Sequence, residues 1–316
     1  MIHWSIVFLL ATVVLAITAA GIAIYGVPSV YNESRLSIHN TTADPYYLVR
    51  VDIIKIMIDP TWNQEGDTGH LGPSLVRLGW HHCALFDSRT GNYGSFGGST
   101  IRMNPELGHD DNKGLQDVRK RLDPIKAKHP WISFGDLYCY AAVVAIGAMG
   151  GPSVPFRGGR RDTEDPSRAP RVVNLPDGSK GPEGNAGVIH QRAVFSRLGL
   201  SDEEGIALIV GGHSIGGAHA SRSGFQGKWT HDNLKFNNAF AKALLNLKFE
   251  KVKSPKGRDQ FIDVADKKIF MLPSDMALLG DRNWLTHLVA FDLDQPRFFS
   301  AFSRAFEKLM ENGRPR

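Results

Sequence analysis

The fold of this 316-residue chain is decided by the stretch Arg77-Leu-Gly-Trp80-His81-His-Cys-Ala-Leu-Phe-Asp87. Pro73 precedes it at a position typical of the first turn of a helix, and apolar residues recur through it at helical spacing. On a helix, Arg77 stands three residues before Trp80 and four before His81, so one face carries a cation, an indole and a base. Such a face is costly to bury in an ordinary core. The stretch therefore predicts a helix that faces a functional site.

The composition is that of an ordinary globular protein, with 42% hydrophobic and 22% charged residues. It excludes disordered, collagen-like and low-complexity classes. The net charge is +5, but no block of five like charges occurs, so a nucleic-acid-binding tail is not indicated. Cys83 and Cys139 are the only cysteines. They exclude a disulfide framework and a cysteine-based zinc site, although the two could pair with each other.

The first part of the chain predicts a membrane anchor. Residues 6–25 form an uncharged apolar run, and about 20 helical residues are needed to cross a bilayer. We expect residues 1–27 to be a retained transmembrane helix and residues 28–45 to be a linker. A cleaved signal peptide is the alternative, because a cleavage site could lie in residues 16–20.

The rest of the chain is expected to be mainly helical. Residues 131–146 have the composition of a buried helix. Ser201 opens a capping-box pattern, which predicts the start of a second helix. Residues 237–247 and 298–310 predict amphipathic helices, the second with a stripe of phenylalanines. The sequence has no alternating strand series and no internal repeat. Residues 151–188 are rich in Gly, Pro and Arg, so they are expected to be a long connection at which the helical part divides.

Gly212-His-Ser-Ile-Gly216 fits G-x-S-x-G, the nucleophile elbow of α/β-hydrolases. Asp275 and His287 follow in the order that a Ser-Asp-His triad requires. However, the elbow belongs to an alternating strand–helix chain, which this sequence does not predict. A serine hydrolase is therefore a remote alternative.

Several motifs in order resemble those of the class I haem peroxidases, the group of cytochrome c peroxidase and ascorbate peroxidase. The resemblance covers about residues 46–312. Besides the stretch quoted first, it is carried by Gly97-Gly-Ser-Thr-Ile-Arg102, Asn112-Lys-Gly-Leu-Gln116, Gly150-Gly-Pro-Ser-Val-Pro-Phe-Arg-Gly-Gly-Arg160, Leu175-Pro-Asp177, Gly211-Gly-His213-Ser-Ile-Gly216 and Met271-Leu-Pro-Ser-Asp275. It implies an all-α fold over residues 46–316. Haem b would lie between a distal lobe, about 46–180, and a proximal lobe, about 181–316.

On the proximal side, the resemblance implies that His213 binds the haem iron. Asp275 would accept the other N–H of that imidazole, which makes the ligand more basic. Trp229 matches a tryptophan that lies against the proximal ligand. That tryptophan holds a radical in cytochrome c peroxidase-like members, whereas the porphyrin holds it in ascorbate peroxidase-like members, so both radical sites stay open.

On the distal side, His81 would take a proton from hydrogen peroxide and return it to the leaving oxygen. Arg77 would stabilise the charge that develops as the O–O bond breaks. Trp80 would pack over the haem, and Asn112 would accept the ring N–H of His81. His82 is expected to point away from this face and to be structural.

Further positions match family residues at the edge of the haem. His219 and Ser223 would contact the propionates, and Arg222 stands where ascorbate peroxidases carry a substrate-binding arginine. A lysine that binds ascorbate in the family is Gly69 here. A proximal K⁺ or Ca²⁺ site is also a candidate, although an asparagine replaces its aspartate. Its residues would be Ser214, Thr230, Asp232 and Asn237.

With the apolar N-terminus, this mixture resembles the membrane-anchored hybrid peroxidases of kinetoplastid protozoa. It implies an enzyme that reduces hydrogen peroxide to water through a ferryl/radical intermediate, with electrons from ascorbate, ferrocytochrome c or both. The compartment is open between the mitochondrial and endoplasmic reticulum membranes. A haem-binding sensor or scavenger with impaired turnover is the alternative, because His82-Cys83-Ala84 departs from the small polar residues usual after the distal histidine.

Overall fold

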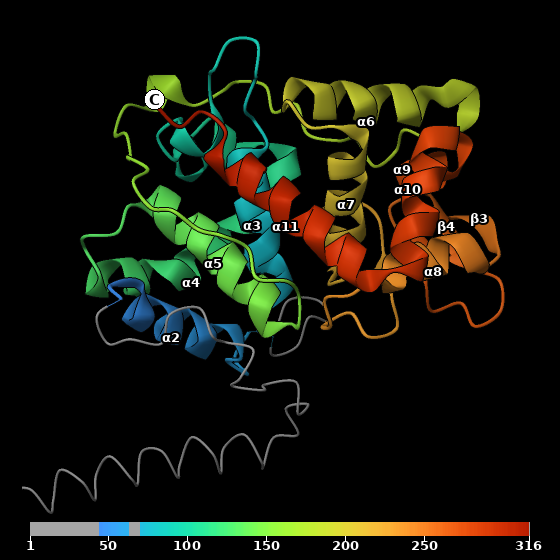
Figure 1. The fold of residues 1–316 in the computed structure, drawn as a ribbon, viewed down its shortest axis with the longest axis horizontal. Coiled ribbons are helices and arrows are strands. Elements are labelled where there is room, and N and C mark those ends of the chain that lie inside the picture. Colours follow the sequence, from blue (N-terminus) through green and yellow to red (C-terminus); the bar gives the residue numbers. More distant parts are fainter. Residues whose placement is uncertain (1–43, 63–69, 316) are drawn as a thin grey trace, which may run out of the picture. The chain divides into compact units, whose positions relative to one another are not determined.

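A computed structural model of the chain describes residues 44–62 and 70–315. The described residues belong to one compact unit. Ten α-helices dominate its described part (Figure 1), which confirms the mainly helical prediction. They are α2 (Tyr46–Met57), α3 (Gly72–Cys83), α4 (Leu115–Lys128), α5 (Phe134–Ala148), α6 (Ala186–Arg197), α7 (Asp202–His213), α8 (Ala239–Asn246), α9 (Pro273–Ala277), α10 (Arg282–Leu293) and α11 (Gln295–Glu311). Short 3-10 helices join them: η2 (Gly94–Phe96), η3 (Thr100–Arg102), η4 (Glu106–Gly108), η5 (Asp110–Asn112), η6 (Pro166–Arg168), η7 (Glu183–Asn185) and η8 (Leu278–Gly280).

The starts of α3 and α7 follow from local sequence. α3 has a proline in its first turn, where a missing N–H costs nothing. At the start of α7, the Ser201 hydroxyl accepts the N–H of Glu204, while the Glu204 carboxylate accepts the N–H of Ser201. This reciprocal pair is the predicted capping box, and it fixes where the helix that ends at His213 begins.

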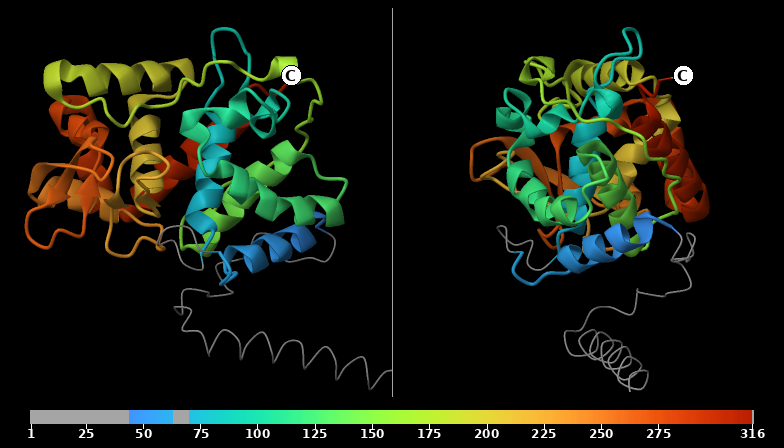
Figure 2. Two further views of the ribbon diagram at one scale, coloured as in Figure 1. Left: turned by 180° about the vertical axis from the view of Figure 1, so that it is seen from behind. Right: turned by 90° about the vertical axis from the view of Figure 1, so that its left-hand side faces the viewer.

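The helices form two groups. α4 and α5 pack on α3, most extensively α5, and α2 packs on α4 and α5, whereas α8, α9 and α10 lie beyond α7 (Figure 1). α11 contacts α3, α7 and α10 and thereby joins the groups, as the views from behind and from the side also show (Figure 2). α3 and α7, which carry the two matched histidines, contact each other where the groups meet.

The phenylalanine stripe of α11 forms much of the core beneath α7. Phe298, Phe302 and Phe306 are each at most 2% exposed, as predicted for a core stripe. A Cβ atom at Gly211 of α7 would lie 2.3 Å from the ring of Phe302. Gly211 therefore allows α7 to approach α11 closely.

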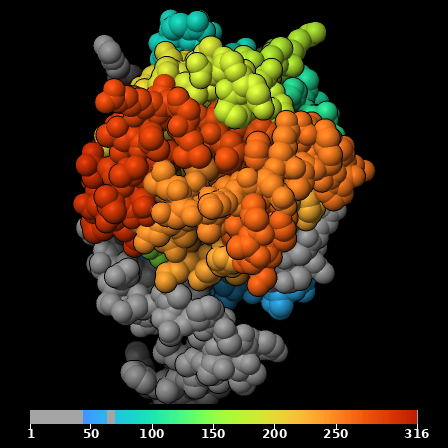
Figure 3. Space-filling view, turned by 90° about the vertical axis from the view of Figure 1, so that its right-hand side faces the viewer, coloured from blue at the N-terminus to red at the C-terminus, as the bar shows by residue number. Residues whose placement is uncertain are grey.

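Two small antiparallel sheets depart from the strand-free expectation. β1 (Gly217–Ala218) pairs with β2 (Gly227–Lys228), and β3 (Phe249–Lys253), β4 (Asp259–Asp263) and β5 (Phe270–Met271) form the second sheet. Its β3–β4 hairpin covers one face of the molecule (orange in Figure 3). Most of β3 is exposed, so its sequence lacks a clear alternation of apolar and polar residues.

The predicted anchor, residues 1–27, lies outside the described residues, as does all but the end of the linker at 28–45. Over 44–62 and 70–315, no helix has both the length and the apolar character that a bilayer crossing requires.

Candidate active site

His81 is held on α3 by a short chain of hydrogen bonds. Its Nδ1 lies 2.8 Å from the side-chain oxygen of Asn112, and the Asn112 amide nitrogen donates to the carbonyl of Glu106 over 2.8 Å. Because the amide N–H₂ is directed at a carbonyl, its oxygen faces the histidine and accepts the Nδ1 proton. Nε2 therefore carries the lone pair. Burial and the nearby Arg77 cation hold the pKa of His81 well below its usual 6.5, so the imidazole is a neutral base.

Arg77 is held one turn before His81 by backbone oxygens. Its guanidinium donates to the carbonyl of Asp111 (2.7 Å) and to that of Lys113 (3.1 Å). Burial and the neighbouring Arg222 lower the pKa of Arg77 to about 10. The Arg222 side chain also lies against Gly114, where a Cβ would be 2.7 Å from its Nε. Within the described ranges neither guanidinium pairs with a carboxylate, so the two cations together favour an anionic ligand.

On the other side, Asp275 joins His213 to Trp229. One carboxylate oxygen lies 2.9 Å from Nδ1 of His213, the last residue of α7. The other accepts the indole N–H of Trp229 and the backbone N–H of Leu272, each over 2.8 Å. The side chain of Asp275 is only 2% exposed. The bond to Asp275 occupies Nδ1 of His213, so Nε2 is the nitrogen left for another partner.

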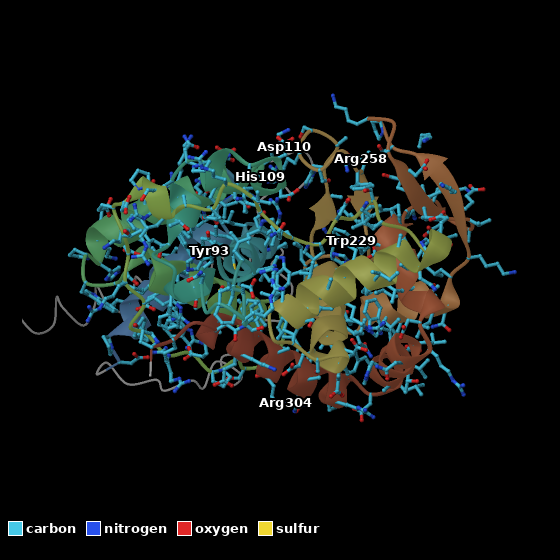
Figure 4. All side chains as sticks on the ribbon, turned by 90° about the horizontal axis from the view of Figure 1, so that it is seen from above. Tyr93, His109, Asp110, Trp229, Arg258 and Arg304 are labelled. Atoms are coloured by element: carbon cyan, nitrogen blue, oxygen red, sulfur yellow. The ribbon has the colours of Figure 1, made fainter. Side chains whose placement is uncertain are left out.

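Trp229 stacks on His213. Their rings are 4.2 Å apart between centroids and nearly parallel, at 10°. Phe270 packs on the far side of the indole, with centroids 4.8 Å apart, and Phe240 meets the imidazole edge-on. Trp229 lies well inside the molecule in Figure 4, whereas Asp110 and Arg258 stand at its edge.

The hydrolase alternative is wrong. The G-x-S-x-G segment ends helix α7 instead of following a strand, and Ser214 is fully buried. Its hydroxyl donates to the carbonyl of Gly211 over 2.8 Å. Asp275 bonds to His213 and not to His287, whose Nδ1 is buried without a hydrogen-bond partner among the described residues. No nucleophile elbow or triad exists here.

The other predicted residues are placed as follows. Trp80 is half-buried on α3, His82 is buried edge-on against Tyr138, and His219 is buried. The Ser223 hydroxyl faces the carbonyl of His219 at 3.4 Å.

Of the candidate cation ligands, Thr230 donates through its hydroxyl to the carbonyl of Ser214 over 2.9 Å. The side chain of Asn237 accepts the N–H of Ala239, and Asp232 is exposed. The described residues contain no cluster of three or more His, Cys, Asp and Glu side chains able to hold a metal ion. A site at these residues would depend on hydroxyl and carbonyl oxygens.

Sequence reasoning missed the groups that orient the site. These are the backbone carbonyls of Glu106, Asp111 and Lys113 and the backbone N–H of Leu272. Backbone atoms occur at every position, so residue identity gave no signal for them.

The donor set fits haem. An imidazole whose Nδ1 is bonded to a buried carboxylate is the usual form of an iron ligand, since that bond leaves Nε2 available and makes it more basic. The guanidinium groups of Arg77 and Arg222, which have no carboxylate partner among the described residues, suit the negative charges of propionates or of a donor. A mainly helical protein with a neutral distal base and an aspartate-bound proximal imidazole has the arrangement of a haem peroxidase.

The family comparison agrees. The family model described as peroxidase matches residues 58–291, and the chain belongs to that family. Cytochrome c peroxidases are among its relatives, which makes it a class I haem peroxidase. The mitochondrial cytochrome c peroxidase of Yarrowia lipolytica is 40% identical over 89% of this chain and 78% of its own length. That of Emericella nidulans is 42% identical over 79% of this chain and 66% of its own. A protein of Aspergillus fumigatus named "Putative heme-binding peroxidase" is 42% identical over 85% and 81% of the two chains.

Proposed function

We propose that this peroxidase reduces hydrogen peroxide to water with electrons from ferrocytochrome c, ascorbate or both. The observation that carries the proposal is the pairing of each imidazole through Nδ1, His81 with Asn112 and His213 with Asp275. Each pairing leaves Nε2 as the reactive nitrogen, one for a proton and one for iron. Haem, when bound, supplies the iron that passes two electrons to peroxide.

His81 and Arg77 divide the distal chemistry. Nε2 of His81 takes the proton from one peroxide oxygen and delivers it to the other, which leaves as water. The Arg77 guanidinium, held by two carbonyls, stabilises the negative charge on the departing oxygen. Trp80 packs above the reacting atoms, and Asn112 keeps His81 in the reactive tautomer.

His213 is proposed as the iron ligand, and Asp275 strengthens it. The carboxylate draws the Nδ1 proton toward itself, so the imidazole becomes a stronger electron donor to the metal. The same carboxylate fixes Trp229 against the ligand. The indole is stacked 4.2 Å from His213. From this position it would give up an electron and then receive one from an external donor.

The donor sites are inferred from charge. Arg222, close to Arg77 and without an ion pair in the part of the chain that the structure describes, suits a small anionic donor such as ascorbate. His219 and Ser223 would contact the propionates. Cytochrome c is proposed because relatives of the chain carry that name.

The remaining assignments are proposals of the same kind. The distal lobe would span about residues 46–180 and the proximal lobe 181–316. Residues 1–27 would anchor the enzyme, and residues 28–45 would link the anchor to it. The names of the relatives favour the mitochondrial membrane over the endoplasmic reticulum. A K⁺ or Ca²⁺ ion would bind at Ser214, Thr230, Asp232 and Asn237.

Steady-state turnover with ascorbate and with ferrocytochrome c, measured side by side on the haem-loaded protein, tests the proposal. Peroxide-dependent oxidation of at least one donor is expected. A six-coordinate, low-spin ferric spectrum and no reaction with peroxide would instead indicate a haem-binding sensor.

A further inference from the structure

Cys83 and Cys139 meet behind the distal helix. Cys83 ends α3, Cys139 lies in α5, and their sulfur atoms are 3.6 Å apart. Both side chains are fully buried, and the two are not joined in a disulfide. The helices are closely packed at this point, since a Cβ at Gly79, one turn before Cys83, would lie 2.6 Å from the Cβ of Ala142. A disulfide has sulfur atoms about 2.05 Å apart, so the two sulfurs must approach each other by roughly 1.5 Å to form one.

Two polar side chains make this pair chemically competent. The side chain of His82 interacts with Cys139, and both residues are buried. The guanidinium of Arg160 is also near, completely buried and paired with Asp136 at 2.9 Å and Glu311 at 3.2 Å. Burial alone would raise the pKa of Cys139, but the Cys83 thiol, Arg160 and His82 together lower it well below its ordinary value. A base and a cation beside a thiol are the conditions that favour a thiolate.

The pair also lies close to the peroxide chemistry. Cys83 follows His81 by two residues, which is roughly 200° around a helix, so the thiol faces α5 while His81 faces the site. Peroxide in the bulk solvent has no direct access to either buried sulfur. Only α3, about 10 Å across with its side chains, separates the thiols from the face that carries His81.

We propose that Cys83 and Cys139 are an internal two-electron donor that closes to a disulfide when peroxide is present and no external donor is bound. The imidazole of His82 accepts the first thiol proton, from Cys139. The two sulfurs lose two electrons and two protons and form one S–S bond. Hydrogen peroxide gains these two electrons and two protons. Its O–O bond breaks, and two water molecules result. The inference rests on the proposed function, because peroxide cleavage at His81 supplies the oxidant.

The test treats the haem-loaded protein with one equivalent of hydrogen peroxide without a donor. Thiols are then alkylated under denaturing conditions, and the peptides are analysed by mass spectrometry. We expect that neither Cys83 nor Cys139 is alkylated and that their two peptides are linked by a disulfide. His81→Leu should keep both thiols free. Cys139→Ala should leave steady-state turnover with an external donor unchanged but prolong the oxidised spectrum after peroxide. Cys83→Ala serves the same purpose if Cys139→Ala does not fold.

The outcomes separate the two proposals. If an external donor is oxidised normally but both thiols stay free after donor-free peroxide, the inference alone is wrong. Sulfinic or sulfonic acids, or an intermolecular disulfide, would also overturn it. Equal thiol loss in His81→Leu would show that peroxide attacks the sulfur atoms without the site. If the protein neither consumes peroxide nor oxidises a donor, the proposed function fails and the inference with it.

Discussion

The indole of Trp229 and the imidazole of His213 form one stacked unit, nearly parallel at 10° and 4.2 Å apart. Asp275 closes the unit, since its two oxygens bind Nδ1 of the histidine and the indole N–H. A change at any one of the three therefore alters both the histidine proposed to bind iron and the neighbouring aromatic ring. Because of this coupling, a mutation on this side can affect donor oxidation and ligand basicity together.

Trp229→Phe should abolish oxidation of ferrocytochrome c and spare oxidation of ascorbate. Phenylalanine retains the stacking surface, but it cannot easily lose an electron and leaves one oxygen of Asp275 without its indole partner. Steady-state rates with the two donors measure the effect. Trp131→Phe, at a tryptophan that is 52% exposed, is the matched control and should change neither rate. Equal loss with both donors would mean that Trp229 does not carry the electron.

His81→Leu should slow the reaction with peroxide by on the order of 10²-fold or more, the usual contribution of a positioned acid–base group. Stopped-flow absorbance of the ferric protein mixed with peroxide measures the rate. His231→Leu, at an exposed histidine paired with Asp266, is the control and should react normally. An unchanged rate in His81→Leu would remove His81 from this role. In the unmutated protein, the rate should fall only at pH values below 6.5, because the pKa of His81 is lowered.

Most of the site could be predicted because its side chains are chemically distinctive and occur in ordered motifs. His81, His213, Asp275 and Trp229 are side chains of this kind. As the resemblance implied, the structure brings His81 to Asn112, His213 to Asp275 and Trp229 to His213. The supports of Arg77 are backbone carbonyls, which no residue type identifies. The contact between Cys83 and Cys139 joins residues 56 positions apart and depends on how α3 packs on α5. The β3–β4 hairpin was missed because an exposed strand has no periodic burial pattern to detect.

Glu106→Gln should stabilise the protein at neutral and higher pH. Burial raises the pKa of Glu106 from 4.5 to about 7, while Thr100 donates a hydrogen bond to the carboxylate over 2.6 Å. Between pH 4.5 and about pH 7, the Glu106 carboxyl keeps its proton in the folded chain but has released it in the unfolded chain. Stability from this group is therefore present below pH 4.5 and is lost as pH rises to about 7.

Glutamine keeps an acceptor for Thr100 and does not ionise, so the gain above pH 7 should be on the order of 1–3 kcal/mol. Urea unfolding of both proteins at pH 5 and pH 8 measures it. The half-buried Glu307→Gln is the control and should show no such pH-dependent gain. If wild type and Glu106→Gln lose the same stability between the two pH values, Glu106 is ionised in the folded protein at both.

Gly211→Ala should destabilise the fold, whereas Gly212→Ala should not. A methyl group at Gly211 would lie 2.3 Å from the Phe302 ring and 2.7 Å from the Phe236 ring, so α7 and α11 would have to move apart. Overpacking of this kind costs about 1–3 kcal/mol. At Gly212 nothing lies within 4 Å of the added atom, and alanine favours a helix over glycine by up to about 1 kcal/mol. Thermal unfolding of the two variants compares adjacent residues of one helix. Equal effects would show that the approach of α11 to α7 does not depend on Gly211.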